Sequence, residues 1–175
     1  TRREPRRDRL PMSAQPQALQ RLLLPMTPLQ LDAVMAIETE AYAFPWSRGN
    51  FVDSIASGYA ASVLYDGEGR ILGYFVAMAG VDEMHLLNIT VAPQAQHRGH
   101  ALYMLDALVD LCQARGAVQL WLEVRETNAR ARAIYLRRGF VHVGVRRGYY
   151  PAPQGQREDA AVMSLAIPGV ADGLE

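Results

Sequence analysis

The sequence predicts one α/β domain built on a mixed sheet of about seven strands with about four helices. Three observations lead to this fold class. The chain has 175 residues, about the size of one domain, and half of them are hydrophobic, which is enough for a packed core. Segments rich in β-forming residues alternate with amphipathic segments of helical period. The strand–helix–strand unit over residues 84–124 implies a parallel strand pair inside the sheet.

The first half of the domain is predicted to hold a strand, two helices and three further strands. Thr-Pro-Leu-Gln at residues 27–30 has the pattern of a capping box with proline at the first helical position. Phe-Pro-Trp at 44–46 ends this helix, and Ser47 caps a short second one. Residues 66–70 form the turn of a hairpin. The strands predicted in this half are residues 21–26, 61–65, 71–78 and 84–91.

The second half alternates helices and strands. Residues 98–115 are predicted to form a long helix that ends at Gly116. Residues 118–124 are apolar on both faces, which is typical of a central strand. A further helix over 128–138 is capped by its first residue, Asn128. Residues 140–147 and 160–167 are the last two predicted strands, joined by a loop that contains Tyr, Pro and Gly.

The two ends of the chain are predicted to lie outside the fold. In residues 1–18 arginines alternate with acidic residues and prolines without an apolar period, which is typical of a disordered extension. A start at Met12 is compatible with this interpretation, and an RNA-contacting arm is the alternative. The single domain is expected to span residues 19–168, and residues 169–175 to form a flexible tail.

Charge and composition argue against several classes of protein. The 18 basic and 18 acidic residues balance, so we expect no direct binding to nucleic acid and none to a membrane surface. No apolar run approaches the ~18 residues that span a bilayer. Cys112 is the single cysteine, which excludes an intrachain disulfide, favours a cytoplasmic location and indicates core packing. The four histidines have no ligand spacing with Cys or carboxylates, so no metal is expected.

A candidate anion-binding turn lies between the strand at 84–91 and the helix that follows it. A helix N-terminus offers free backbone N–H groups and the positive end of the helix dipole, which suits a pyrophosphate. Arg98 adds positive charge there, and Gly99 allows the backbone to approach a ligand closely. The segment matches neither a Walker loop nor a dinucleotide fingerprint. On these residues alone, a helix capped by a glycine turn is the alternative.

Two residues are candidates for the chemistry. Glu123 lies near the C-terminal end of an apolar strand, where an unpaired carboxylate is costly to bury, an arrangement that suits a general base. The alternative is a salt bridge from Glu123 to Arg125 or another arginine. Tyr135 lies on the apolar side of the predicted helix over 128–138. Its spacing alone fits equally well a core residue whose hydroxyl is satisfied.

Together these motifs resemble the GNAT superfamily of acetyltransferases. Gln-x-x-Gly-x-Ala at residues 96–101, after a strand and Val-x-Pro, is similar to the acetyl-CoA signature of that superfamily. The motifs at 44–46, 121–125 and 149–151 resemble the narrower ribosomal-protein-alanine N-acetyltransferase (RimI) family. The resemblance covers about residues 26–167. It implies the GNAT fold, in which a splayed parallel strand pair holds acetyl-CoA.

The resemblance also implies a role for each matched position. Glu123 would be the general base and Tyr135 the general acid, in a direct attack of an amine on the thioester within a ternary complex. Asn128 would contact CoA. The residues implied to bind the pantetheine arm are Ile89, Thr90 and Val91, and those implied to bind the pyrophosphate are His97, Arg98, Gly99, His100, Ala101 and Leu102.

The implied acceptor is the N-terminal α-amine of a small-subunit ribosomal protein, number eighteen, that begins with Ala. Acidic side chains at Glu38, Asp82 and Glu83 are expected to attract a basic peptide. The alternatives are a GNAT enzyme that acetylates lysine side chains or a small amine, and a non-catalytic CoA- or ribosome-binding module. The residues expected to line the acceptor groove are Phe44, Pro45, Trp46, Tyr149 and Tyr150, although Trp46 could instead fill the core.

Overall fold

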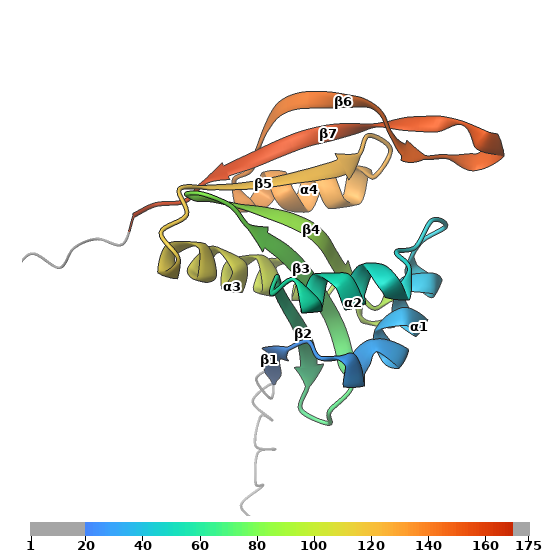
Figure 1. Cartoon of the computed structure of the whole chain (residues 1–175), viewed down its shortest axis with the longest axis vertical. Coiled ribbons are helices and arrows are strands. Elements are labelled where there is room, and N and C mark those ends of the chain that lie inside the picture. Colours follow the sequence, from blue (N-terminus) through green and yellow to red (C-terminus); the bar gives the residue numbers. More distant parts are fainter. Residues whose placement is uncertain (1–19, 170–175) are drawn as a thin grey trace, which may run out of the picture.

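The protein is described by a computed structural model that covers residues 20–169. The sheet has seven strands in the order β1-β2-β3-β4-β5-β7-β6, and Figure 1 shows helices packed against it, which confirms the predicted fold class. The strands are β1 (Arg21–Pro25), β2 (Ala60–Asp66), β3 (Ile71–Ala79), β4 (Glu83–Val91), β5 (Gln119–Arg125), β6 (Val141–Pro151) and β7 (Arg157–Ala166). The α-helices are α1 (Leu31–Ala41), α2 (Arg48–Ala56), α3 (His100–Ala114) and α4 (Ala129–Arg138).

The predicted extension over 1–18 and the tail beyond residue 169 lie outside the described residues. Within residues 20–169, no helix is both long enough and apolar enough to cross a bilayer.

The predicted helix caps are present. The Gln30 side chain accepts a hydrogen bond from the backbone N–H of Thr27, while the Thr27 hydroxyl accepts from Leu29. Ser47 and Asn50 form the same reciprocal pair at the start of α2. These bonds satisfy backbone donors that a helix start leaves free. The Thr27 pair caps the short 3-10 helix Pro28–Gln30 that leads into α1, whereas the Ser47 pair caps α2 directly and so fixes where the chain enters α2 after the Phe44–Trp46 segment.

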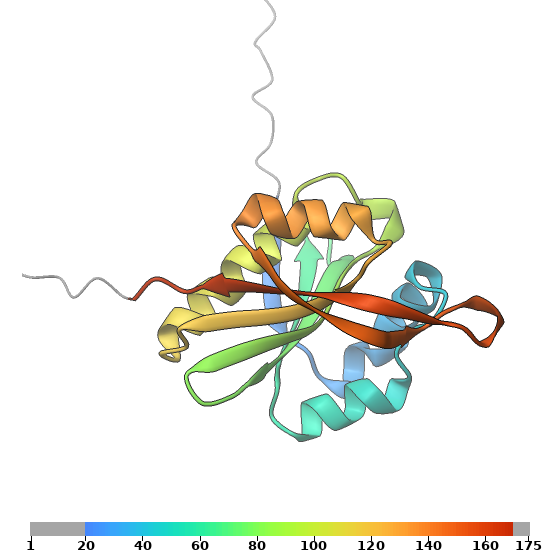
Figure 2. The same ribbon diagram turned by 90° about the horizontal axis from the view of Figure 1, so that it is seen from above.

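Two apolar cores lie on opposite faces of the sheet, and Figure 2 shows the helices divided between these faces. Successive side chains of a strand point to opposite faces. In β3, Phe75 and Ala77 therefore pack toward α3 and α4, whereas Tyr74 and Val76 pack toward α1 and α2. Cys112 is fully buried in the α3 core, as predicted, and burial raises the pKa of its thiol to about 11.

The parallel strands β4 and β5 separate part-way along their length. Their pairing runs from Glu83 opposite Gln119 to Leu86 opposite Leu122 and then ends. A register shift between β3 and β4 accompanies this point: Val76 pairs with Asn88 and Ala77 with Leu86, so Leu87 forms a bulge. We call the region beyond Leu86 and Leu122 the splay. It leaves the backbone of β4 facing β5 without a strand partner, as the resemblance implied.

The predicted loop between the last two strands is largely strand, so that prediction was wrong. β6 continues to Pro151 and β7 begins at Arg157, with Tyr150 paired to Glu158. Gly148 and Pro151 suggested a loop, but a register shift between Arg146 and Tyr150 accommodates Gly148 at φ 59°. Figure 2 shows the resulting hairpin projecting beyond the other strands.

Candidate active site

Glu123 is the first residue of β5 beyond its pairing with β4, so it lies at the mouth of the splay. Its side chain is only 7% exposed. Oε2 lies 2.5 Å from Nε2 of His85, and Oε1 lies 3.4 Å from Nε of Arg146. The salt bridge considered as an alternative therefore exists, but it joins Glu123 to Arg146 and not to Arg125.

A cavity of about 290 Å³ adjoins this carboxylate. Leu120 and Leu122 face the α3 core, so the alternating residues Trp121 and Glu123 point to the opposite face of the sheet. The buried indole N–H of Trp121 has no hydrogen-bond partner among residues 20–169. The lining consists of Met78, Gly80, Glu83, His85, Trp121, Glu123, Arg146 and Val162.

Tyr135 lies on α4 and is 8% exposed. Its ring packs against Phe140 with 5.7 Å between centroids, which accounts for its apolar position in the sequence. Burial raises the pKa of its hydroxyl well above the ordinary value, and the nearby phenols of Tyr42 and Tyr150 raise it further. Tyr135 therefore keeps its proton at neutral pH, which a proton donor requires.

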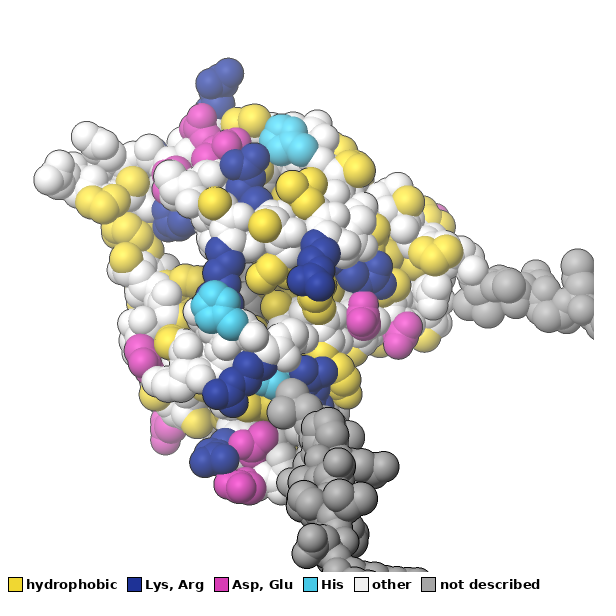
Figure 3. All heavy atoms as spheres, turned by 180° about the vertical axis from the view of Figure 1, so that it is seen from behind, with side chains coloured by type: hydrophobic (Ala, Val, Ile, Leu, Met, Phe, Trp, Pro, Cys, Tyr) yellow, Lys and Arg dark blue, Asp and Glu magenta, His cyan; other side chains and the backbone are white. Residues whose placement is uncertain are grey.

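A second cavity, of about 430 Å³, opens on the α3–α4 face. Gly99 is the N-cap of α3 and has φ 80°, a left-handed conformation that favours glycine. Figure 3 views this face, where arginine and histidine side chains surround a hollow. Six of the residues that line the cavity were predicted to bind CoA, namely Val91, His97, Gly99, His100, Ala101 and Leu102. The rest of the lining consists of Arg130, Ala133, Ile134 and Arg137.

The other predicted CoA residues lie outside this cavity lining. Ile89 and Thr90 lie on β4 within the splay, where the Ile89 carbonyl accepts a hydrogen bond from the Tyr42 hydroxyl. Arg98 is exposed at the turn. The Asn128 side chain caps α4 by accepting from the backbone N–H of Ala131. The structure therefore brings six of the ten predicted residues together and places the rest nearby on β4, the turn and α4.

Arg125 joins the two segments that were expected to line the acceptor groove. Its guanidinium carbon lies 5.5 Å from the ring centroid of Phe44 and 4.6 Å from that of Tyr150. It also donates a 2.8 Å hydrogen bond to the carbonyl of Pro151. The Phe44–Trp46 segment and the β6–β7 hairpin thus both contact the guanidinium of Arg125.

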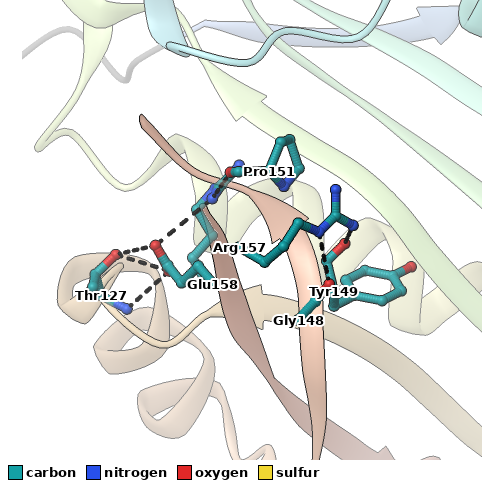
Figure 4. A network of polar contacts seen from close by, with 7 residues as sticks. Thr127, Gly148, Tyr149, Pro151, Arg157 and Glu158 are labelled. Carbon is teal, nitrogen blue, oxygen red and sulfur yellow. Dashed lines mark hydrogen bonds and ion pairs between the residues drawn. The ribbon is translucent and has the colours of Figure 1, made fainter. Parts of the chain in front are cut away.

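The hairpin itself is held by a polar network that Figure 4 shows. Glu158 accepts hydrogen bonds from the backbone and hydroxyl of Thr127. Arg157 donates to the carbonyls of Gly148 and Tyr149, both at 2.9 Å. These bonds replace the regular ladder that the register shift interrupts. They keep Tyr149 and Tyr150 at a defined place despite the irregular strand.

The acetyltransferase (GNAT) family model matches residues 31–140 of the chain. This chain belongs to the GNAT family. It is an acetyl-CoA-dependent acyltransferase. A Salmonella typhimurium protein named [ribosomal protein bS18]-alanine N-acetyltransferase is 40% identical over 137 residues, which are 78% of this chain and 91% of that protein.

Solved structures agree with this assignment. The crystal structure of the ribosomal-protein-S18-alanine N-acetyltransferase from Escherichia coli has a TM-score of 0.79 and 35% identity, covering 89% of this chain and 99% of that one. A phosphinothricin acetyltransferase from Sinorhizobium meliloti, solved with AcCoA, shares the fold with a TM-score of 0.71 at 22% identity, over 87% and 91% of the two chains.

Two expectations on the acceptor side of this GNAT domain need revision. Trp46 is partly core, because its ring packs 5.2 Å from that of Phe51 and belongs to the α1–α2 core. Glu38 is 1% exposed and bonded to neighbouring groups, so the expectation that it attracts a peptide from solution was wrong. Asp82 and Glu83 remain exposed. Phe44 and Tyr149 are each 41% exposed and so are accessible.

Arg21 is a site residue that the sequence analysis missed. Arg21, on β1, donates to Nδ1 of His100 at 3.1 Å and to the carbonyl of Arg98 at 2.9 Å. Burial lowers the pKa of His100, and the charges of Arg21 and Arg98 lower it further, so its ring is neutral there. Arg21 lies 79 residues from His100, and no local pattern signals such a contact. No group of three or more His, Cys, Asp or Glu side chains in residues 20–169 is arranged to hold a metal ion.

Proposed function

We propose that the protein transfers the acetyl group of acetyl-CoA to the N-terminal α-amine of an alanine-starting small-subunit ribosomal protein. The observation that carries this proposal is the position of Glu123 at the mouth of the splay. Its carboxylate points to the face opposite the α3–α4 cavity. Acetyl-CoA bound on the α3–α4 face and an acceptor amine bound on the opposite face of the sheet would therefore meet beside this carboxylate. The names of the relatives at 35–40% identity support the acceptor class.

The residues of the α3–α4 cavity fit acetyl-CoA. The left-handed Gly99 exposes backbone N–H groups at the start of α3, and Arg130 and Arg137 add positive charge at the cavity wall. A pyrophosphate would be held by these groups. At Ile89 and Thr90 the edge of β4 that faces β5 has no strand partner, which suits an extended amide-bearing arm. Bound there, acetyl-CoA supplies a thioester that an amine can attack.

In this proposal Glu123 takes a proton from the acceptor ammonium, whose ordinary pKa of roughly 8 keeps much of it protonated near neutral pH. The free amine nitrogen then forms a bond to the acetyl carbon while the carbon–sulfur bond breaks, and as the amide forms the nitrogen releases its second proton to solvent. Tyr135 gives its phenolic proton to the departing sulfur. The attack is direct, within a ternary complex. Cys112 takes no part because it is fully buried in the core.

The test is mass spectrometry of a synthetic Ala-starting, Lys-containing ribosomal peptide incubated with the protein and acetyl-CoA. The matched control is the same peptide with its N-terminus blocked. We expect one added acetyl group on the α-amine of the free peptide and none on the blocked one. Acetylation of the blocked peptide would instead indicate lysine side chains. No transfer despite acetyl-CoA binding would reject the ribosomal acceptor and direct the search to other amines.

A further inference from the structure

One buried carboxylate contacts both the segment proposed to bind the acceptor and the strand proposed to bind acetyl-CoA. Glu38 on α1 is 1% exposed, and its Oε1 accepts a 3.0 Å hydrogen bond from the backbone N–H of Trp46. Its Oε2 accepts from the Tyr74 hydroxyl. The side-chain amide of Asn88 donates to both oxygens, at 3.3 and 3.4 Å. Trp46 belongs to the acceptor segment, whereas Asn88 begins the free edge of β4.

From Asn88 the polar contacts continue along β4 to α1. The Thr90 hydroxyl donates to Oδ1 of Asn88 at 2.8 Å, and the Tyr42 hydroxyl lies 2.7 Å from that of Thr90. We call Glu38, Trp46, Asn88, Thr90 and Tyr42 the Glu38 network. Tyr42 also reaches the carbonyl of Ile89 at 3.2 Å, on the edge of β4 proposed to bind the donor. Enclosure of the Tyr42 hydroxyl raises its pKa to about 12.

The carboxylate determines the direction of every proton in this network. An ionised carboxylate only accepts, so the amide nitrogen of Asn88 must face Glu38 and its oxygen must face Thr90. Thr90 then has its single proton on the Asn88 side, so Tyr42 is the donor of the Tyr42–Thr90 pair, and its one proton is shared between the Thr90 hydroxyl and the Ile89 carbonyl. Hydrogen bonds aligned in one sense strengthen one another in an enclosed site. Loss of the charge at Glu38 would therefore weaken the hydrogen bonds as far as Tyr42, three links away.

Burial of this carboxylate is costly for the fold. Within residues 20–169 no arginine or histidine forms an ion pair with Glu38, so neutral donors alone compensate its charge. Isolated buried charges are destabilising compared with apolar residues of similar size. A residue that served only to pack α1 against β3 would not need the charge. What the charge supplies is a common acceptor on α1 for groups on β3, β4 and the Phe44–Trp46 segment.

We propose that Glu38 is a positioning residue that couples the donor-binding edge of β4 to the acceptor segment Phe44–Trp46. It touches neither substrate and acts through Trp46 on one side and through Asn88, Thr90 and Tyr42 on the other. Donor binding along Ile89 and Thr90 then sets the position of the acceptor segment. This inference rests on the proposed function for the identity of the two sides, but its first test needs only acetyl-CoA.

The test uses Trp46 as the reporter. The chain has two tryptophans, so Trp121→Phe leaves Trp46 as the only one. In that background we expect acetyl-CoA to change the Trp46 emission in a saturable way. Glu38→Gln should remove more than about half of this change while acetyl-CoA still binds. Glu40→Gln, an exposed acid on the same helix, is the matched control and should leave the response intact.

A charge-swapped pair separates coupling from general damage. In Glu38→Gln the amide N–H₂ group of the new glutamine can face that of Asn88, which leaves no acceptor between them. Alternatively the Asn88 side-chain amide rotates by half a turn, and Thr90 must then accept from Asn88 where it donated before. The double variant Glu38→Gln/Asn88→Asp restores one carboxylate opposite one amide and should recover the response. For the peptide reaction, Glu38→Gln should lower kcat/KM by about tenfold to a hundredfold, with partial recovery in the double variant.

Asn88→Ala keeps the proposal testable if Glu38→Gln does not fold, because it interrupts the network while leaving Glu38 bonded to Trp46 and Tyr74. We expect it to remove the Trp46 response as well. A folded Glu38→Gln or Asn88→Ala protein with an unchanged response and with peptide kinetics within about twofold of wild type would overturn the proposal. Absence of peptide acetylation in the wild type would reject the proposed acceptor and leave the emission test valid.

Discussion

His85 and Glu123 lie on neighbouring parallel strands and meet at 2.5 Å between Nε2 and Oε2, at the last point where β4 and β5 are close. His85 is the more exposed of the two, with 25% of its side chain accessible against 7% for Glu123. Because the His85 imidazole bonds to Oε2 of Glu123, Oε1 is the carboxylate oxygen that can face the splay. Arg146 approaches that oxygen at 3.4 Å and would have to yield to an incoming ammonium.

From this pair we predict that His85→Leu lowers kcat for the peptide about tenfold, because the carboxylate loses the donor that orients it. His85→Gln, which can still donate, should lose less. Glu123→Gln should reduce kcat by a hundredfold or more, roughly the contribution of a general base. Steady-state kinetics measures all three, and acetyl-CoA affinity should stay within about twofold throughout. Full activity of Glu123→Gln would refute the proposed base.

Tyr135→Phe removes the hydroxyl and keeps the ring that packs against Phe140. We expect kcat to fall by roughly tenfold to a hundredfold, because the departing sulfur loses its proton donor. The melting temperature and the acetyl-CoA dissociation constant should change little. Tyr103→Phe, at a half-exposed phenol outside the splay, is the control. A large loss of acetyl-CoA affinity in Tyr135→Phe would mark the residue as structural.

Arg125→Lys tests the link between the two acceptor segments. Lysine keeps the charge but loses the planar guanidinium over the Phe44 and Tyr150 rings and alters the bond to Pro151. We expect KM for the peptide to rise about tenfold, since each lost contact contributes roughly 1 kcal/mol. Acetyl-CoA binding should be unchanged. Arg147→Lys, one residue from the ion pair of Arg146 and exposed, should have no effect on peptide KM.

Gly99→Ala tests the turn before α3, which is proposed to bind the pyrophosphate of acetyl-CoA. At φ 80° an L side chain is strained by about 1–2 kcal/mol, and a shift of this turn would displace the free N–H groups of α3. We expect acetyl-CoA affinity to fall at least tenfold by calorimetry. Gly58→Ala is a matched control, with φ 74° and no atom within 4 Å of the added carbon. It should lower stability by a similar amount and leave acetyl-CoA affinity unchanged.

The buried phenols predict a dependence of stability on alkaline pH. Tyr42, Tyr74, Tyr135 and Tyr150 all have a pKa above the ordinary value, chiefly because of burial. In the unfolded chain they lose protons near pH ~10, whereas folding holds those protons to higher pH. Their contribution to stability is therefore complete below about pH 10 and is lost as pH rises above it.

This chain is well suited to that measurement, because all 18 of its basic residues are arginine and no lysine titrates in the same range. Absorbance at the tyrosinate band should show the four phenols ionising later in the folded protein than in denaturant. Tyr42→Phe should reduce the late fraction by one group of the eight tyrosines. Superimposable folded and unfolded titrations would contradict the burial of these hydroxyls.

Local patterns were sufficient for much of this fold. The capping box at Thr27, the glycine turn at Gly99 and the apolar strand that contains Glu123 each depend on neighbouring residues, and the structure contains them where expected. The two strands of the β6–β7 hairpin were predicted too short because Gly148 and Pro151 weaken strands on average. A local irregularity with side-chain bonds from Arg157 makes both residues compatible with pairing.

Contacts between distant segments could not be read from the sequence. His85 meets Glu123 across 38 residues, and Tyr42 meets Thr90 across 48. Each depends on strand register and on the bulge at Leu87, which no short pattern encodes. Glu38 was misjudged for the same reason: an acidic residue on a helix is normally solvated, and only the packing of α1 on β3 and β4 encloses it.

The separation of β4 from β5 leaves each of these strands with an unpaired inner edge, besides the two outer edges of the sheet at β1 and β6. Unpaired strand edges invite other chains to pair with them, and proteins usually protect them. Here the open edge lies inside the sheet, between strands that still pair on their other sides, so a folded neighbour cannot align a strand along it. Only a slender, extended chain can enter. Backbone groups that would promote aggregation on the outside of a protein are thereby accessible only to a narrow ligand such as the one proposed.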